Sequence, residues 1–280
     1  MCILVFCYWT PRQRRQGPIK EIINVKSKLS DIPTCISTDD TIITCPQKIS
    51  NQFNDYFSNI AANILNGRKF EGYEEGYGDF MSYMPPPEPD SITLHNVTSD
   101  DIFYIINKFD ETKGTGPCSI PIKILKLISL EISEPLSLIT NLCFRTGVHP
   151  EKLKFAKIFP VFKKGSKLLT SNYRPISLLS NLNKIFEKLI FSNVYKFLEA
   201  KKSIYHLQYG FRPKHSTTHA LINITERIRE AIDGKKVACG VFVDLQKAFD
   251  TVNHNILLAK LYRYGIRGAA YDWFKSYLSN

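Results

Sequence analysis

The stretch Val241-Phe242-Val243-Asp244-Leu245 decides the fold, because it is apolar and rich in strand-forming residues apart from one aspartate. It ends a nearly all-apolar run over residues 237–245, which predicts a short β-strand buried on both faces. An isolated charge inside such a strand carries a large desolvation cost. We therefore expect Asp244 at an edge of the strand, where it faces a polar cleft or pairs with a cation.

Asp244 has two interpretations from its local sequence, and both stay open. A carboxylate at a strand end can bind Mg²⁺, which prefers oxygen ligands, and a pair of such ions can activate an attacking oxygen and stabilise a leaving one. Alternatively, Asp244 pairs with a lysine or caps residues 247–250. For Asp250 we expect the N-cap of the helix that begins near Val252. The other possibility is an unrelated Mg²⁺-dependent phosphotransferase that uses both aspartates.

The composition excludes several classes of protein. Of the 280 residues, 44% are hydrophobic and 12% aromatic, which is too much for a disordered chain. The longest apolar run, residues 2–9, is too short to span a membrane and lacks the features of a secretory signal. The seven cysteines are scattered without zinc spacing, and the pair His215 and His219 lacks a third ligand. Because the cysteines are odd in number and scattered, the sequence also argues against a disulfide scaffold, and we expect a reducing intracellular setting.

The positive charge is concentrated in one part of the chain. The formal net charge is +11, and residues 151–230 alone contain 16 basic and 5 acidic residues, a surplus as large as that of the whole chain. Clustered Lys and Arg favour a polyanionic partner, because they displace counterions from phosphates. The alternative is a solvated basic face that keeps the protein in solution. Charge alone does not distinguish these two interpretations.

Hydrophobic periodicity predicts a largely helical chain with one hairpin. Strand-forming residues over 155–162 and 173–179 flank a basic turn at Lys163 and Lys164, which predicts a basic-tipped β-hairpin. Apolar residues at helical spacing predict helices elsewhere. Two helical pieces are expected before Gly147, with the split between them near Pro135. The other helices are expected near residues 49–64, 98–109, 182–200, 216–233, 252–264 and 269–278.

Residues 242–252, FVDLQKAFDTV, resemble the first catalytic motif of reverse transcriptases from non-LTR retrotransposons, especially jockey-like elements. Other segments resemble motifs of this family in the same order and spacing: NYRPISLL at 172–179, QYGFRP at 208–213 with Ser216 and Thr217, KGTGP at 113–117 with Ile120 and Pro121, and WFKSYL at 273–278. Several motifs in register make a chance match implausible. The resemblance covers roughly residues 95–280.

The resemblance assigns roles to single residues. It implies that Asp244 is the first metal-binding aspartate of the polymerase palm and that the Leu245 carbonyl lies near the second metal. Phe249 corresponds to the aromatic residue that crowds the 2′ position of the incoming nucleotide, which selects dNTP over rNTP. The cations expected to grip the triphosphate are Arg174, Lys184 and Arg212. Those expected to contact nucleic-acid phosphates are Lys163, Lys164 and Lys214.

The resemblance also implies an α+β fold, namely a truncated right-hand polymerase with fingers and the start of the palm, preceded by a helical N-terminal extension. We predict a partly helical extension over residues 1–66, a flexible Gly/Pro linker over 67–95 and a partial reverse transcriptase domain over 96–280. No aromatic-x-Asp-Asp turn follows Asp250. We therefore expect a fragment that does not polymerise DNA alone and whose strand over 237–245 has an unpaired flank.

The predicted function is part of an RNA-directed DNA polymerase, which transfers nucleotides from dNTPs to a primer 3′-OH on an RNA template. The implied partners are an RNA template, a DNA primer and dNTPs, without a membrane. The implied cofactor is Mg²⁺ or Mn²⁺, without a small-molecule cofactor. The alternative is a non-catalytic RNA- or template-binding module derived from the fingers. RNA binding that depends on salt but not on Mg²⁺ would favour this alternative.

Overall fold

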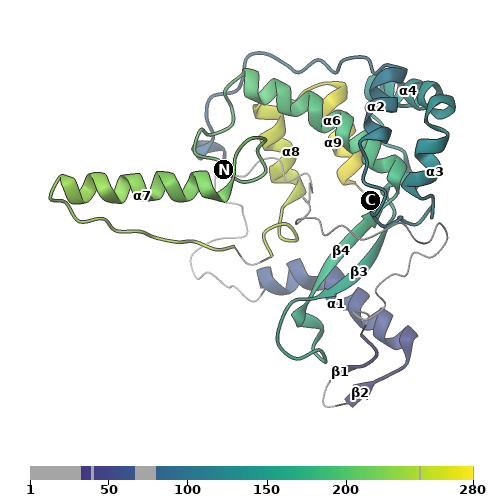
Figure 1. The fold of residues 1–280 in the computed structure, drawn as a ribbon, viewed down its shortest axis with the longest axis horizontal. Coiled ribbons are helices and arrows are strands. Elements are labelled where there is room, and N and C mark those ends of the chain that lie inside the picture. The colour runs from purple at the N-terminus through teal and green to yellow at the C-terminus, as the bar shows by residue number, and fades with distance from the viewer. Residues whose placement is uncertain (1–32, 39–40, 67–79, 246, 280) are drawn as a thin grey trace, which may run out of the picture.

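The computed structural model describes residues 33–38, 41–66, 80–245 and 247–279 (Figure 1). This part of the chain is mostly helical and contains two separate two-stranded antiparallel sheets, so the predicted α+β character is confirmed. The arrangement as a truncated right-hand polymerase stays a prediction. The elements in chain order are β1 (Ile36–Thr38), β2 (Thr41–Ile43), α1 (Pro46–Asn66), η2 (Phe80–Tyr83), α2 (Ser99–Asn107), α3 (Ile122–Leu127), α4 (Ser129–Thr146), α5 (Glu151–Lys154), β3 (Ala156–Phe162), η3 (Thr170–Asn172), β4 (Tyr173–Leu179), α6 (Asn181–Ala200), α7 (Thr217–Asp233), α8 (His254–Arg263) and α9 (Ala269–Leu278).

The main hydrophobic core lies among α2, α4, α6, α8 and α9. The apolar faces of these amphipathic helices converge there, and Ile106, Ile190 and Trp273 are fully buried. Helix α2 begins with a capping box, in which the Thr98 side chain accepts from the Asp101 backbone N–H and the Asp101 side chain accepts from that of Thr98. These helices confirm the predictions from periodicity.

The predicted position of the break between the two helices before Gly147 is wrong. Helix α4 runs through Pro135 instead of ending there, and the break between α3 and α4 lies at Ile128. Helix α4 packs against α2 and α9, and such tertiary packing can offset the cost of a proline inside a helix. The expected end at Gly147 is confirmed, because this residue has a left-handed φ of 68° and its N–H donates to the Cys143 carbonyl.

The predicted strand over residues 237–245 is also wrong. The chain is irregular there, and its apolar side chains face outward: Val237, Val241 and Phe242 are 96%, 84% and 88% exposed. A strand needs a neighbour to satisfy its backbone, and in the described ranges only β1 with β2 and β3 with β4 are paired. The residues preceding this run form α7, which has no buried residue and extends away from the other helices (Figure 1).

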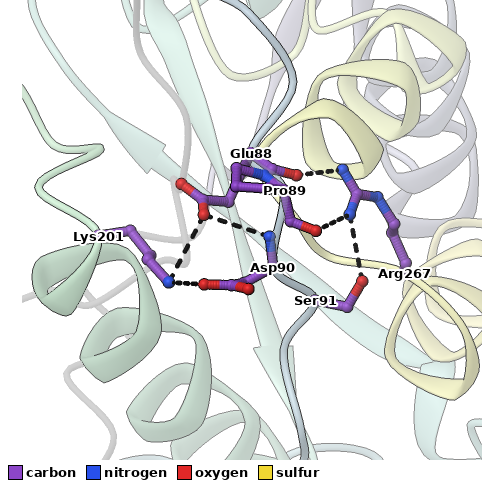
Figure 2. Close-up of polar contacts among 6 residues, drawn as sticks. All are labelled: Glu88, Pro89, Asp90, Ser91, Lys201 and Arg267. Atoms are coloured by element: carbon purple, nitrogen blue, oxygen red, sulfur yellow. Dashed lines mark hydrogen bonds and ion pairs between the residues drawn. The ribbon is translucent and has the colours of Figure 1, made fainter.

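Residues 85–92 form a strap that joins the end of α6 to the turn between α8 and α9 (Figure 2). Lys201 at the end of α6 pairs with Glu88 and Asp90, while the Arg267 guanidinium donates to the carbonyls of Glu88 and Pro89. The backbone N–H of Ile92 donates to the Gly265 carbonyl at 2.9 Å. Part of the predicted linker over 67–95 is thus firmly attached, although the domain boundaries stay a prediction.

The region before the strap packs against the hairpin of β3 and β4 rather than against the main core. Ile36, Ile49 and Phe53 form a second hydrophobic cluster with Tyr173 of β4. Across residues 33–38, 41–66, 80–245 and 247–279, no helix has the length and apolar character that a membrane crossing requires.

Candidate functional site

The β3–β4 hairpin has one covered face and one open face. Side chains alternate along a strand, so Tyr173 and Arg174 point to opposite faces. Tyr173 is 2% exposed and packs against α1, whereas Arg174 is exposed. The register pairs Arg174 with Val161 and Leu178 with Lys157. Directly opposite residues share a face, so Lys157 and Arg174 lie together on the open face.

All charged side chains of this hairpin are cationic. Residues 156–179 include five basic residues and no acidic residue. None of the ion pairs formed within the described ranges involves these five side chains, which are Lys157, Lys163, Lys164, Lys167 and Arg174. The predicted tip residues Lys163 and Lys164 are exposed at the turn. Cations without an ion-pair partner can bind phosphates without first breaking an ion pair.

The loop at residues 113–117 lies beside the end of β4 and the start of α6. Gly116 is required there, because a Cβ atom on it would lie 2.3 Å from the Leu179 carbonyl carbon. The Lys184 ammonium group donates to the Asn181 side-chain oxygen at 2.8 Å and lies 3.4 Å from the Gly114 carbonyl. Leu178 of the open hairpin face also packs over Gly114. The structure therefore places Lys184 at one end of this face.

Burial and a neighbouring carboxyl group act in opposite directions on the pKa of Lys184. Burial lowers the pKa of Lys184 and the nearby Lys113 lowers it further, while Glu187 acts in the opposite direction. Tyr277 of α9 donates to Glu187 at 2.6 Å, and Asn183 donates to the same oxygen at 3.1 Å. Burial raises the pKa of Glu187, against the effect of these donors and Lys184. A hydrogen bond from α9 thus holds the carboxyl group that acts on the pKa of Lys184.

Asp244 is exposed, as is its neighbour Leu245 at 66%. Among the residues that the structure describes, no group of three or more His, Cys, Asp or Glu side chains could hold a metal ion. One exposed carboxylate does not fit a pair of divalent ions, which need several oxygen ligands in fixed positions. The described part of the chain therefore does not form the predicted metal site by itself.

Phe249 lies in a turn and contacts the motif that precedes α7. Its ring is 51% exposed and stands edge-on to Phe211, with the ring centroids 6.0 Å apart. The turn is closed by the N–H of Asp250, which donates to the Lys247 carbonyl at 2.9 Å. Asp250 is not the N-cap of α8, because Asn253 accepts from the Ile256 N–H at 3.0 Å. Asn is as good a cap as Asp and stands directly before the helix.

Two of the predicted cations lie away from the hairpin. Arg212 is occupied in an ion pair: its Nε donates to Glu199 at 2.9 Å, and a second nitrogen lies 3.3 Å from the other carboxylate oxygen. The guanidinium also lies near the Tyr205 carbonyl. Lys214 is exposed in the following turn, with a positive φ of 62°. The structure therefore does not bring Arg212 or Lys214 together with Arg174 and Lys184.

Sequence reasoning missed Lys157, and it missed the contact between Glu187 and Tyr277. Lys157 is a single cation in a strand, and only the register with β4 places it on the face of Arg174. The alternation of the two predicted strands around one turn could have indicated this position. The contact between Glu187 and Tyr277 joins residues 90 positions apart, and no local pattern indicates it.

Comparison with known proteins gives consistent similarities. Residues 161–280 match the family described as reverse transcriptase (RNA-dependent DNA polymerase). Among curated proteins of Drosophila melanogaster, the chain is 29% identical over 243 residues to the probable RNA-directed DNA polymerase from transposon BS and 33% identical over 182 residues to that from the mobile element jockey. These alignments cover 85% and 65% of this chain but 27% and 20% of the relatives. The chain thus spans about a quarter or less of their length.

Proposed function

We propose that this chain, a member of the reverse transcriptase family of non-LTR retrotransposons, forms the part of an RNA-directed DNA polymerase that binds nucleic acid and the nucleotide triphosphate. The relatives that it matches are named as RNA-directed DNA polymerases of mobile elements. The reaction of the whole enzyme is nucleotidyl transfer from a dNTP to a primer 3′-OH on an RNA template. The contribution of this chain to that reaction is binding and orientation.

The open face of the β3–β4 hairpin is the observation on which the proposal rests. Lys157 and Arg174 share this face, Lys163 and Lys164 stand at its tip, and Lys184 lies at its other end. Repeated phosphates along a strand of RNA or DNA suit such a row of cations, which release condensed counterions on binding. The opposite face packs against α1 around Tyr173 and Phe162, so this part of it is not free for nucleic acid.

The triphosphate is proposed to bind at the Lys184 end of this face. Arg174 can donate two hydrogen bonds to phosphate oxygens through its planar guanidinium group. Lys184 is held in place by Asn181 and Gly114, which reduces the conformational freedom that it loses on binding. Arg212 does not belong to this proposal, because its guanidinium already pairs with Glu199.

Asp244 and Phe249 are proposed to act on the reacting end of the nucleotide. Phe249 has an exposed ring that could lie against C2′ and leave no room for a hydroxyl group. Asp244, with the Leu245 carbonyl, is proposed as one contributor to a divalent metal site that needs further carboxylates. A bound metal would stabilise the charge that develops on the transferred phosphate. The inactivity of the isolated chain, like the choice between Mg²⁺ and Mn²⁺, stays a prediction.

The exposed position of Asp244 also supports a second candidate function, which is RNA binding without chemistry. The two candidates agree on the hairpin and differ in what they require of Asp244. Binding to the hairpin needs only phosphates and cations, whereas nucleotidyl transfer needs the aspartate and a metal. Asp244→Asn therefore distinguishes them, since it changes the aspartate and leaves every residue of the hairpin unchanged.

The proposal is tested by measuring the affinity of the 280-residue chain for a labelled single-stranded RNA over a range of salt concentrations. Five phosphate contacts predict that log K falls with log[salt] with a slope of about −3.5. Affinity that is independent of salt would contradict the proposal. Primer extension on an RNA template, with Mg²⁺ and dNTPs, is the second readout. Extension that is lost in Asp244→Asn would show that the chain is catalytic by itself.

A further inference from the structure

We propose that helix α1 is a brace for the β3–β4 hairpin and that Phe53 is the positioning residue through which it holds the cationic face in its binding conformation. This inference rests on the proposed nucleic-acid-binding role of that face. It assigns a function to residues 33–66, which lie outside the segment matched by the reverse transcriptase family. No side chain of this brace needs to touch the ligand.

The brace contacts the hairpin through an aromatic cluster. The rings of Phe53 and Tyr173 meet edge-on with their centroids 5.0 Å apart, and Phe162 of β3 stands 5.5 Å from Tyr173. Phe53 also contacts Phe57 on the next turn of α1 at 5.6 Å. Phe53 and Tyr173 are 5% and 2% exposed. This cluster contains residues from both strands, so it fixes the hairpin as a unit.

The cluster is separate from the main core. It contains Ile36, Ile49, Phe53 and Tyr173, whereas the main core is built from α2, α4, α6, α8 and α9. Because the hairpin contributes to the small cluster, its covered face depends on α1 rather than on the main core. A two-stranded hairpin is only marginally stable without such packing. Loss of the brace is therefore expected to loosen β3 and β4 without unfolding the helical core.

A further contact joins residues 33–66 to the turn of the hairpin, and a second hydrogen bond holds this turn from within the hairpin. The backbone N–H of Ser37 donates to the Leu168 carbonyl at 2.8 Å, and the Tyr173 hydroxyl donates to the Lys167 carbonyl at 2.8 Å. Both acceptors lie in the turn that joins the two strands. Residues 33–66 thus contact the turn of the hairpin as well as its face around Tyr173.

The brace acts on affinity through the population of the binding conformation. If only a fraction of molecules has the hairpin fixed, the apparent dissociation constant increases by the inverse of that fraction. A variant in which one molecule in ten keeps the fixed hairpin binds RNA about tenfold more weakly. The number of phosphates contacted stays the same, so the slope of log K against log[salt] is unchanged. Removal of a contacting cation, in contrast, reduces this slope.

The experiment compares Phe53→Ala with Phe103→Ala, a control that removes a partly exposed ring from α2. Hydrogen exchange of residues 156–179 and RNA affinity over a range of salt concentrations are measured on the full chain. Phe53→Ala is expected to increase exchange in β3 and β4 but not in α6 or α9. It is expected to weaken RNA binding about tenfold with an unchanged salt slope, and Phe53→Leu should restore most of the affinity.

Each outcome decides the proposal. Unchanged exchange in β3 and β4 in Phe53→Ala would overturn it, and so would a reduced salt slope, which would indicate direct contact with RNA. If Phe53→Ala unfolds the whole chain, Ile49→Ala removes a smaller part of the same cluster and is judged by the same exchange criterion. If the wild-type chain does not bind RNA, the proposed function fails, while hydrogen exchange still decides whether α1 braces the hairpin.

Discussion

The β3–β4 hairpin and residues 237–245 are similar in composition but different in structure. Both are rich in Val, Ile, Leu and Phe, and both are predicted as strands. The hairpin pairs over seven residues on each side and is covered on one face by α1. Residues 237–245 have no strand beside them in the described chain, and their side chains are exposed.

The difference shows that a strand is defined by its neighbours more than by its composition. Each backbone N–H and C=O group needs a partner. The turn between β3 and β4 brings the two strands side by side, so each supplies the other with partners. The preceding residues of the 237–245 run form α7, which leads the chain away from the other helices (Figure 1). Strand-forming residues without a partner strand therefore remain irregular and exposed.

The largest effect expected from this comparison concerns stability. Tyr173→Ala should lower the free energy of unfolding by about 3–5 kcal/mol, because it leaves a cavity among packed rings. Phe242→Ala removes an exposed ring of similar size and should change the free energy by less than about 0.5 kcal/mol. Urea denaturation of both variants is the measurement. Equal losses in the two variants would mean that residues 237–245 are as well packed as the hairpin.

Much of the fold is predictable from local sequence. Helix α2 is indicated by the capping residues Thr98 and Asp101, and the end of α4 is indicated by Gly147, since both signals act within one turn. Long helices with one apolar stripe, such as α6, are indicated by periodicity. The continuation of α4 through Pro135 is not predictable in this way, because a proline is a local signal for a helix end and tertiary packing can override it.

The candidate site is less predictable than the fold. The sequence resemblance predicts Arg174, Lys184 and Asp244 as site residues, but only the register of the hairpin places Lys157 on the face of Arg174. Arg212 and Lys184 are equivalent as local sequence signals. Their different surroundings arise because Glu199 is close to Arg212, whereas Lys184 faces a backbone carbonyl and an amide.

The second largest effect is a pH dependence of the free energy of unfolding, which arises from a buried histidine. His149 is fully buried among the rings of Phe186, Trp273 and Tyr277, and burial lowers its pKa to about 4. The unfolded chain therefore takes up a proton near pH 6.5, where the folded chain does not. The free energy of unfolding should decrease by up to about 3 kcal/mol as the pH falls from 6.5 towards 4.

This pH effect is measured as a difference between two chains. Urea denaturation of the wild type and of His149→Leu at several pH values cancels the contributions of the other ionisable groups. The variant should lose less stability than the wild type over this pH range. Parallel pH profiles for the two chains would show that His149 is accessible to protons in the folded state.

A smaller effect on the free energy of unfolding is expected for the strap over residues 85–92, which is compared with the run over 237–245. The strap lacks a regular strand too, but Lys201 and Arg267 hold it (Figure 2). Arg267→Gln should lower the free energy of unfolding by about 1–2 kcal/mol, because several hydrogen bonds from a charged group are lost. Hydrogen exchange at Ile92 should increase at the same time. Unchanged exchange would mean that Arg267 does not hold the strap.

The smallest effect concerns Asp244. Its carboxylate is exposed and forms no ion pair within the described ranges, so Asp244→Asn should change the free energy of unfolding by less than about 0.5 kcal/mol. RNA affinity in the absence of divalent metal should also stay unchanged. A loss of stability above about 1 kcal/mol would mean that this aspartate is packed or paired in the folded chain, and it would then not be free to bind a metal.

The most direct test of the account is RNA binding by two variants that lose the same charge. Arg174→Ala removes a cation from the open hairpin face, and Arg227→Ala removes an exposed cation from α7. The account predicts that Arg174→Ala weakens binding and makes the slope of log K against log[salt] shallower by about 0.7, whereas Arg227→Ala leaves the slope unchanged. Equal effects of the two substitutions would contradict it, because net charge rather than the hairpin face would then determine binding.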